Sequence, residues 1–211
     1  MCIRDSLWGK NPFVSSVHLL PLLKEAKARG ARLVLIDPVR HKTASLADEY
    51  IAPRPGGDLA LAFGVASLLF QTGRVVPEAA SFCEGLDAFR AFALSKTPAN
   101  WAEDAGVPPE SLELLASTLC ARPCNIQVGW GMGRRTNGSA IVRALDALGA
   151  LTGNLGISGG GVNFYFKRRG AFDTSLLTKA WPRTLSEPLL GREILEAKEP
   201  PVRAVWVTAG N

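Results

Sequence analysis

The stretch Arg32-Leu33-Val34-Leu35-Ile36-Asp37-Pro38 is a short apolar run that ends at an acidic residue and a proline. A continuous apolar run of this length is typical of a strand buried on both faces of a parallel sheet. A helical pattern over residues 15–29 precedes it, and Leu7-Trp8 has the character of the end of an earlier strand. These segments predict a β-α-β unit. We therefore expect an α/β fold, a Rossmann-like parallel sheet with helices on both faces that is incomplete at both termini.

The pattern of apolar runs and turn residues continues along the chain and defines three regions. Residues 1–6 fit neither a helix start nor a clean strand, and we interpret them as an artefactual leader. Residues 7–163 are expected to form the Rossmann-like domain, and residues 164–211 an irregular excursion and a return strand leading toward a neighbouring domain. The other expected elements are strands at 47–52, 125–128 and 202–207, helices at 59–70, 78–92 with a break at Gly85, 98–105, 108–119, 140–151 and 187–197, and a glycine-rich loop at 152–163.

The composition is that of an ordinary globular protein and argues against two classes of partner. The 211 residues are 47% hydrophobic and 20% charged. No apolar run approaches the roughly 20 residues that cross a bilayer, so we expect no direct membrane insertion. The net charge is +5, but the clusters Arg134-Arg135 and Lys167-Arg168-Arg169 adjoin glycine-rich loops. An anionic small ligand accounts for these clusters as well as a solvated surface does, and we expect no binding of nucleic acid.

Cysteine and histidine are too sparse to support a metal site or a catalytic triad. Cys120 and Cys124 lie four positions apart with no second pair to complete four ligands, so buried or incidental thiols are the simpler interpretation. His18 and His41 are the only histidines and stand far apart in the sequence. The sequence therefore gives little support to a His-based metal site or a Ser–His–Asp triad.

A glycine-rich segment, Gly129-Trp130-Gly131-Met132-Gly133, joins the expected strand at 125–128 to the expected helix at 140–151. Glycines at a strand-to-helix joint let backbone N–H groups approach a phosphate closely, and the start of the helix favours negative charge. The segment therefore predicts a phosphorylated ligand lying across the carboxyl edge of the sheet.

Two acidic residues expected at the same edge each have two interpretations. Asp37 follows the strand at 32–36, where nucleotide-binding folds often place an acid that accepts hydrogen bonds from a ribose. It could equally cap the turn before Pro38. Asp58 could N-cap the helix at 59–70. It could instead face a purine base, because a carboxylate suits the N1–H and amino donors of guanine.

In their order along the chain, these segments resemble those of the molybdopterin oxidoreductase family, which includes formate dehydrogenases, nitrate reductases, dimethyl sulfoxide reductases and thiosulfate or polysulfide reductases. The resemblance covers about residues 7–211. The segments that carry it are Trp8-Gly9-x-Asn11-Pro12, Ile36-Asp37-Pro38-x-Arg40, Thr43-Ala44, Ala47-Asp48, Pro55-Gly56-x-Asp58, Thr97-Pro98, Ala105-Gly106-Val107, Gly129–Gly133, Leu151-Thr152-Gly153-Asn154-x-Gly156-x-x-Gly159-Gly160-Gly161 and Gly210-Asn211.

The resemblance implies a particular cofactor. Family members bind two molybdopterin guanine dinucleotides, which chelate one molybdenum, or sometimes tungsten, through dithiolenes. This chain would hold one of the two dinucleotides. By the resemblance, Asn11 and the backbone of Gly9 lie near the phosphates, Asp37 bonds a ribose and Asp58 bonds the guanine.

The resemblance assigns further residues to the rest of the dinucleotide. Gly131-Met132-Gly133 would line its pterin or pyrophosphate side, and Arg40 and Arg135 would offset the pyrophosphate charge. The remaining cofactor contacts that we expect are Trp8, Pro12, Gly56, Gly129, Trp130, Gly210 and Asn211.

The resemblance also identifies what catalysis needs beyond this chain. In the family, the metal ligand (a cysteine, selenocysteine, serine or aspartate) and the cysteines of a [4Fe–4S] cluster precede the Trp-Gly-x-Asn-Pro segment, and neither is present here. We expect a scaffold, inactive alone, from a prokaryotic molybdenum oxidoreductase that moves two electrons between a small substrate and iron–sulfur centres. Its expected partners are the remaining domains of the parent chain and an iron–sulfur electron-transfer subunit. Its compartment, cytoplasm or periplasm, stays open.

Two other functions remain open from the sequence. An NAD- or thiamine-diphosphate-dependent enzyme would share the β-α-β unit and its acid, although no G-x-G-x-x-G segment follows the first strand. Tight binding of either cofactor would favour that alternative. A basic interaction module or nucleic-acid-binding module would instead show an affinity that falls steeply with salt.

Overall fold

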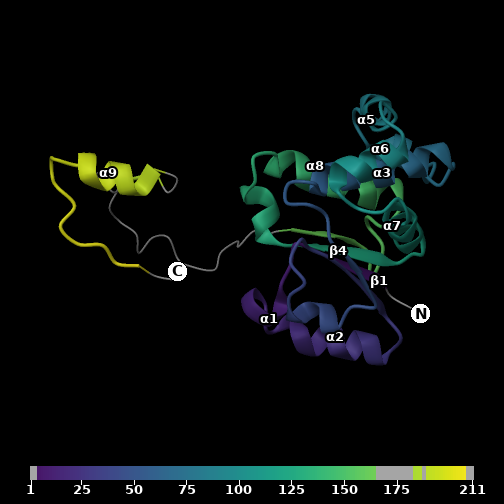
Figure 1. Ribbon diagram of the computed structural model, residues 1–211, viewed down its shortest axis with the longest axis horizontal. Helices are drawn as coiled ribbons and strands as arrows, with labels where there is room; N and C mark the ends of the chain where they lie inside the picture. The colour runs from purple at the N-terminus through teal and green to yellow at the C-terminus, as the bar shows by residue number, and fades with distance from the viewer. Residues whose placement is uncertain (1–3, 165–182, 187–188, 208–211) are drawn as a thin grey trace. The chain divides into compact units, whose positions relative to one another are not determined.

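Five parallel strands form the central sheet of the protein, in the spatial order β3-β2-β1-β4-β5. Their bounds are β1 Arg4–Trp8, β2 Arg32–Ile36, β3 Glu49–Ile51, β4 Cys124–Val128 and β5 Gly161–Asn163. The structure is a computed structural model that describes residues 4–164, 183–186 and 189–207 (Figure 1). The chain divides into two units, Met1–Phe166 and Lys167–Asn211, and the sheet belongs to the first.

Strand β1 is the centre of the sheet and pairs with both of its neighbours along its whole length. Leu7 lies opposite Leu35 of β2 and Gln127 of β4. Because side chains alternate along a strand, Leu7 packs with Leu23 of α2 on one face, while Trp8 joins the larger core on the other. The apolar run of β2 is likewise buried on both faces, which confirms the buried parallel strand predicted there.

Helices cover both faces of the sheet, which confirms the predicted α/β class. In Figure 1, α1 and α2 lie below the sheet, whereas α3, α7 and α8 lie above it. None of the described helices is long and apolar enough to cross a membrane. The helical elements are α1 Pro12–Ser15, α2 Leu19–Ala28, η1 Lys42–Ser45, α3 Asp58–Gln71, α4 Ala79–Phe82, α5 Leu86–Ala93, α6 Pro98–Ala105, α7 Glu110–Cys120, η2 Trp130–Arg134, α8 Gly138–Leu151 and α9 Leu190–Glu196.

Two of the predicted boundaries near the N-terminus were wrong. Strand β1, of which only the end was expected at residues 7–8, begins at Arg4, and its Ser6 is fully buried. The single helix expected over 15–29 is two helices, α1 and α2. Pro21 explains the break, because it has no N–H to donate and its ring would clash inside a continuous helix, whereas it is tolerated in the first turn of α2.

Two C-terminal predictions were also wrong. The loop expected over 152–163 ends in strand β5, which pairs with β4 from Asn125↔Gly161 to Gln127↔Asn163. At Gly160 the glycine allows close packing of the backbone, since a Cβ there would lie 2.4 Å from the Asn154 carbonyl oxygen. The return strand expected at 202–207 is not formed, because no strand lies beside it among the described residues of its unit.

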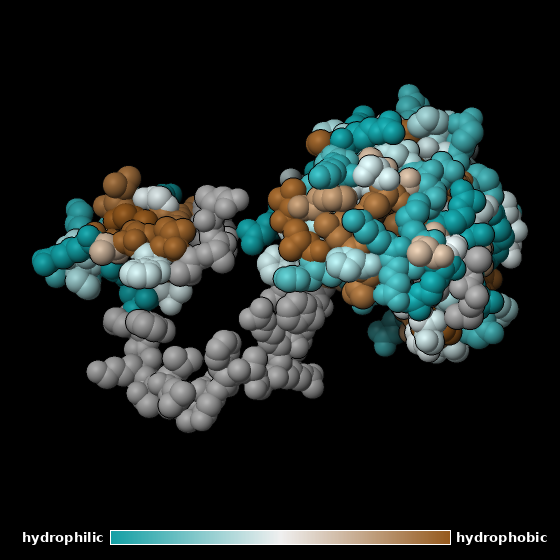
Figure 2. Space-filling model, turned by 90° about the horizontal axis from the view of Figure 1, so that it is seen from below, coloured by the Kyte–Doolittle hydropathy of each residue, from teal (hydrophilic) through white to brown (hydrophobic). Residues whose placement is uncertain are grey.

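The second unit exposes apolar side chains on the elements that the structure describes. Leu195 of α9 is 85% exposed and Trp206 is 90% exposed. Figure 2 shows a brown, apolar area on the part of the molecule that carries α9, bordered by teal, hydrophilic residues. The apolar stretch at 202–207, whose composition predicted a buried strand, therefore lies exposed. A parallel strand is stable only when its backbone groups pair with a neighbouring strand.

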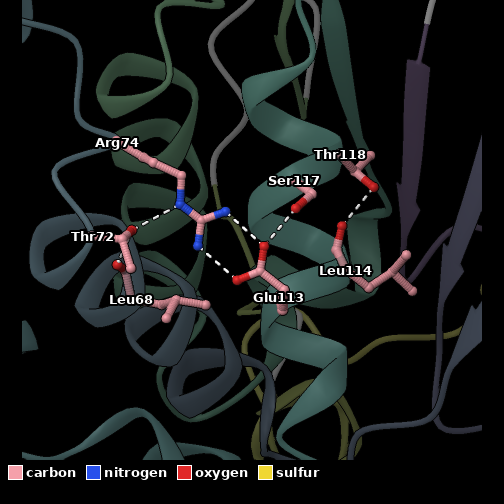
Figure 3. Close-up of polar contacts among 7 residues, drawn as sticks. All are labelled: Leu68, Thr72, Arg74, Glu113, Leu114, Ser117 and Thr118. Carbon is pink, nitrogen blue, oxygen red and sulfur yellow. Dashed lines mark hydrogen bonds and ion pairs between the residues drawn. The ribbon is translucent and has the colours of Figure 1, made fainter.

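A polar clamp ties the end of α3 to α7 (Figure 3). Arg74 donates two hydrogen bonds to the Glu113 carboxylate, at 2.8 and 2.7 Å. Arg74 also donates to Thr72 Oγ1 at 2.8 Å, and Ser117 donates to Glu113 at 2.6 Å. The bond from Arg74 is the main cause that lowers the pKa of Glu113 to about 2.

Glu113→Gln is expected to lower the free energy of unfolding at pH 7 by about 0.5–1 kcal/mol, because the pair is partly exposed. The pKa of Glu113 is lowered on folding from 4.5. The stabilisation is therefore present above about pH 4.5 and is lost as the pH falls toward 2. Denaturant unfolding across this range of pH measures the loss.

Glu110→Gln is the control, because it removes a charge from the same first turn of α7. Equal effects of the two substitutions at pH 7 would assign the loss to the helix N-terminus rather than to the clamp.

Candidate functional site

The loops after β1 and β4 meet backbone to backbone at the carboxyl edge of the sheet. The Gly9 N–H donates to the Ile36 carbonyl oxygen and the Gly129 N–H donates to the Trp8 carbonyl oxygen, both at 2.8 Å. A Cβ on Gly129 would lie 1.7 Å from the Gly9 carbonyl oxygen. Gly9 has a φ of +60°, and a Cβ there would lie 2.3 Å from Met132 Cε. At Gly129 any side chain would collide with the Gly9 backbone, and at Gly9 the positive φ favours glycine.

These two loops lie at the point where the strand order reverses direction, between β1 and β4. In open α/β sheets, ligands bind in the crevice at this switch point. The structure has a cavity of about 870 Å³ there. Its lining residues are Gly9, Lys10, Asn11, Ser15, Ser16, Gln127, Gly129, Trp130, Gly131, Asn163 and Phe164. The cavity therefore brings together expected site residues from two loops that are far apart in the sequence.

Sequence reasoning missed several polar residues of this cavity, among them Lys10, Gln127 and Asn163. Burial lowers the pKa of Lys10 below its usual range. Lysine at this position adds a cationic group to the edge where a phosphorylated ligand was predicted. All three residues lie at or directly after the carboxyl end of a strand, and that position was the signal that could have identified them.

A network of hydrogen bonds joins the loop after β1 to the loop after β2. Thr43 Oγ1 donates to Asn11 Oδ1 at 3.1 Å, and the Thr43 N–H donates to His41 Nδ1 at 3.3 Å. His41 Nε2 lies 3.4 Å from Asp37 Oδ2. Since Nδ1 accepts, neutral His41 carries its proton on Nε2, which faces the Asp37 carboxylate. Hydrogen bonds thus join Asn11, Thr43 and His41, and a contact without a hydrogen bond continues from His41 to Asp37. The sequence had marked His41 only as an unsupported metal or triad residue.

Asp37 caps its own turn, as one of its two interpretations predicted. Its Oδ1 accepts the Val39 N–H at 2.9 Å. Tyr50 donates to the Asp37 carbonyl oxygen at 2.8 Å, and the Arg40 guanidinium lies over the Tyr50 ring at 5.4 Å from its centroid. A carboxylate oxygen can accept more than one hydrogen bond, so the ribose role of Asp37 stays a prediction. Arg40 does not line the cavity.

Asp58 does not cap α3, so that interpretation was wrong. The N-cap is Gly57, which has no side chain to cap the helix, and Asp58 is the first helical residue. A Cβ on Gly57 would lie 2.5 Å from the Ala105 carbonyl oxygen, so packing against α6 fixes where the helix begins. The Asp58 side chain turns inward instead and is only 2% exposed.

The Asp58 carboxylate is held by residues from two other segments. The fully buried Trp8 indole N–H donates to Oδ1 at 3.0 Å. Arg135 Nε lies 3.8 Å from Oδ2. Neither Oδ2 nor Arg135 Nε makes a hydrogen bond within the described part of the chain. Buried polar atoms without partners are uncommon in proteins and call for an explanation.

The other expected site residues are two buried side chains, three glycines and two residues that the structure does not describe. Pro12 and Met132 are buried. Gly131 has open space around it and Gly133 packs against Phe164, whereas Gly56 combines open space with a φ of +87°. Gly210 and Asn211 lie outside the described residues.

One motif of the resemblance has a purely structural role here. Asn154 is fully buried, and its Oδ1 accepts the Cys124 N–H at the start of β4. Its amide donates to the Leu119 carbonyl oxygen and to Thr152 Oγ1, both at 2.8 Å. These bonds join α7, α8 and β4 at the amino end of β4, away from the cavity.

Among the residues that the structure describes, no group of three or more His, Cys, Asp or Glu side chains could hold a metal. Burial raises the pKa of the Cys124 thiol to about 12. Such a thiol is neutral and inert, which agrees with the predicted buried thiol.

Comparison with known proteins gives one family and several relatives. The model of the family described as molybdopterin oxidoreductase matches residues 6–206. The chain is 34% identical over 211 residues to the probable oxidoreductase YyaE of Bacillus subtilis, covering 97% of this chain and 32% of that protein. It is 36% identical over 180 residues to dimethyl sulfoxide reductase DmsA of Haemophilus influenzae, covering 73% and 22%. It is 37% identical over 151 residues to assimilatory nitrate reductase of Haloferax mediterranei, covering 71% and 21%.

A solved structure shares the fold. Acetylene hydratase from Pelobacter acetylenicus matches with a TM-score of 0.65 and 23% identity, over 73% of this chain and 22% of that chain. In each of these comparisons, this chain spans about a third or less of the relative's length.

Two glycines of the loop after β4, Gly129 and Gly131, provide a matched pair of substitutions. Gly129→Ala is expected to lower the free energy of unfolding by about 3 kcal/mol, the upper end of overpacking costs, because its methyl group would collide with the Gly9 backbone. Gly131→Ala meets nothing within 4 Å and is expected to change stability by less than about 0.5 kcal/mol. Denaturant unfolding compares them. Equal losses would contradict the close approach of the two loops.

Proposed function

Because this chain belongs to the molybdopterin oxidoreductase family, we propose that it binds a molybdopterin cofactor in the guanine dinucleotide form, along the carboxyl edge of its sheet. The family and its relatives support a molybdopterin-type cofactor with molybdenum. The proposal adds the guanine end, and the Asp58 carboxylate is the observation that carries it.

A buried carboxylate oxygen without a hydrogen bond fits a ligand that offers N–H donors. Asp58 Oδ1 is already engaged by Trp8, so Oδ2 is the oxygen that remains for a ligand. Guanine presents N1–H and an exocyclic amine side by side, and both are donors. Hydrogen bonds to an ionised, desolvated group are stronger than neutral ones. A guanine base would therefore satisfy the atom that the protein leaves unsatisfied.

The remainder of the dinucleotide fits the residues along the same edge. In this assignment Asp37 bonds a ribose. The Gly9 backbone, Lys10 and Asn11 lie toward the phosphates, and the open space at Gly131 takes the pterin side. When bound, the cofactor supplies the redox chemistry through its metal. The chain orients it and offsets its charge.

The parent enzyme that we propose is a molybdenum- or tungsten-dependent oxidoreductase acting on a small substrate. Its metal ligand, its second dinucleotide site and any [4Fe–4S] cluster would lie in segments that the relatives possess beyond the third of their length matched here. Electrons would leave through iron–sulfur centres, with an electron-transfer subunit as partner.

Substitution of Asp58 tests the base assignment. Asp58→Asn keeps an oxygen that can accept from the Trp8 N–H. It removes the negative charge and puts an amide NH₂, which is a donor, where guanine would donate. We expect guanosine diphosphate to bind at least about tenfold more weakly, the loss of one charged hydrogen bond, measured by calorimetry. Adenosine diphosphate affinity should change little.

Asp37→Asn is the matched control, because it removes the same charge at the proposed ribose position. It should weaken both diphosphates alike, since they share the ribose. Loss of guanine preference in Asp37→Asn but not in Asp58→Asn would contradict the base assignment.

The cofactor assignment is tested on the full-length parent protein. After purification it should contain molybdenum or tungsten with a pterin, by elemental analysis and fluorescence of the oxidised pterin. Hydrolysis of its pyrophosphate should release guanosine monophosphate. A parent that carries neither metal nor pterin would contradict the proposal, and pterin without the guanine nucleotide would contradict only its guanine part.

A further inference from the structure

Arg135 and a guanine base would compete for the same oxygen of Asp58. Arg135 lies directly after η2, and its Nε is buried 3.8 Å from Oδ2. The Asp58 side chain is only 2% exposed, and the Arg135 guanidinium is a charged group that lies at ion-pair distance from Oδ2. A base that reaches Oδ2 must therefore move the guanidinium aside.

The two competitors share the same chemical group. A guanidinium carries N–H and NH₂ donors on one carbon, in a plane that matches a carboxylate. The N1–C2–N2 edge of guanine has the same arrangement, an N–H beside an NH₂ on one carbon. Adenine offers a single amino donor beside the N1 acceptor, so it cannot replace both donors of the guanidinium.

The cost of burying a charge makes this exchange selective. A buried carboxylate that loses its partner without replacement is destabilised strongly. In the described residues, the charge of Asp58 is offset at Oδ2 by the Arg135 guanidinium at ion-pair distance, without a hydrogen bond. Only a ligand that presents a comparable donor edge can displace Arg135 without leaving the carboxylate uncompensated.

We propose that Arg135 is an intramolecular competitor that mimics the donor edge of guanine at Asp58, sets the selectivity of the base site, and turns to the ligand's phosphates once displaced. This rests on the proposed function, since it presumes a guanine nucleotide at Asp58. It reassigns Arg135 from a simple pyrophosphate contact to a residue with two alternative partners. Arg135 does not itself line the cavity, but the loop that carries it supplies Gly129, Trp130 and Gly131 to the lining, so phosphates bound there would lie on the same loop.

The proposal predicts opposite effects of one substitution on two ligands. Arg135→Met keeps the length of the side chain and removes its charge and donors. Guanosine, which has no phosphates, should bind about tenfold more tightly, because it no longer has to displace Arg135. A tenfold change in affinity corresponds to about 1.4 kcal/mol. The preference for guanosine diphosphate over guanosine should shrink, because the diphosphate loses its cation. Calorimetry with both ligands on the 211-residue chain measures this.

Two further variants complete the experiment. Arg143→Met removes an arginine from the exposed face of α8 and should leave both affinities unchanged. Arg135→Gln retains one amide donor for Oδ2 and should shift both affinities in the same directions as Arg135→Met by a smaller factor. It serves as the test should the methionine variant fail to fold, as judged by thermal melting.

The outcomes separate this inference from the function on which it rests. If folded wild-type protein binds neither guanosine nor its diphosphate, the guanine assignment itself fails. If wild-type protein binds both ligands and Asp58→Asn weakens them, but removal of Arg135 leaves guanosine affinity unchanged or lowers it, only the competitor role fails. A guanosine affinity that falls in parallel with the diphosphate would identify Arg135 as a direct contact to the base.

Discussion

The contact between the Gly9 and Gly129 backbones is the constraint on which the site depends. Strands β1 and β4 are adjacent and parallel, so their loops leave the sheet at the same edge and must pass each other. With a Cβ on Gly129 the loops would have to separate, because that atom would lie 1.7 Å from the Gly9 carbonyl oxygen. Close contact at this point also holds Met132 beneath Gly9 and leaves the cavity open beyond it. The geometry of the crevice therefore follows from two residues without side chains.

A second constraint is electrostatic. The protein keeps the Asp58 carboxylate almost wholly out of water, with an indole N–H on one oxygen and a guanidinium near the other. This arrangement is a poor source of stability, because desolvation offsets most of the attraction in a buried ion pair. The guanine-binding role that we propose would give this carboxylate a function beyond stability, beside Trp8 from β1 and Arg135 from the loop after β4.

The sequence predicted the elements whose periodicity was strong. The helix at 98–105 and the break at Gly85 are confirmed, as is the buried strand at 32–36. It failed where a tertiary partner overrode local pattern. Glycines that predicted a loop at 161–163 pair as strand β5 because β4 offers an edge, while the apolar stretch at 202–207 lies exposed because its unit has no strand beside it in the described residues. In both cases, strand formation was decided by a neighbour rather than by residue preference.

By itself, the sequence determined the fold class, the order of the loops at the carboxyl edge and the family. These follow from local periodicity and from motifs that are contiguous in the chain. Only the tertiary structure decided which side chains meet. It set Asp58 against Trp8, 50 positions away, and against Arg135, and it gave Asn154 a structural role at the far end of β4. The physical reason is that strand order places β4 beside β1. This brings distant hydrogen-bonding groups into a shared interior, where each must find a partner that local sequence does not specify.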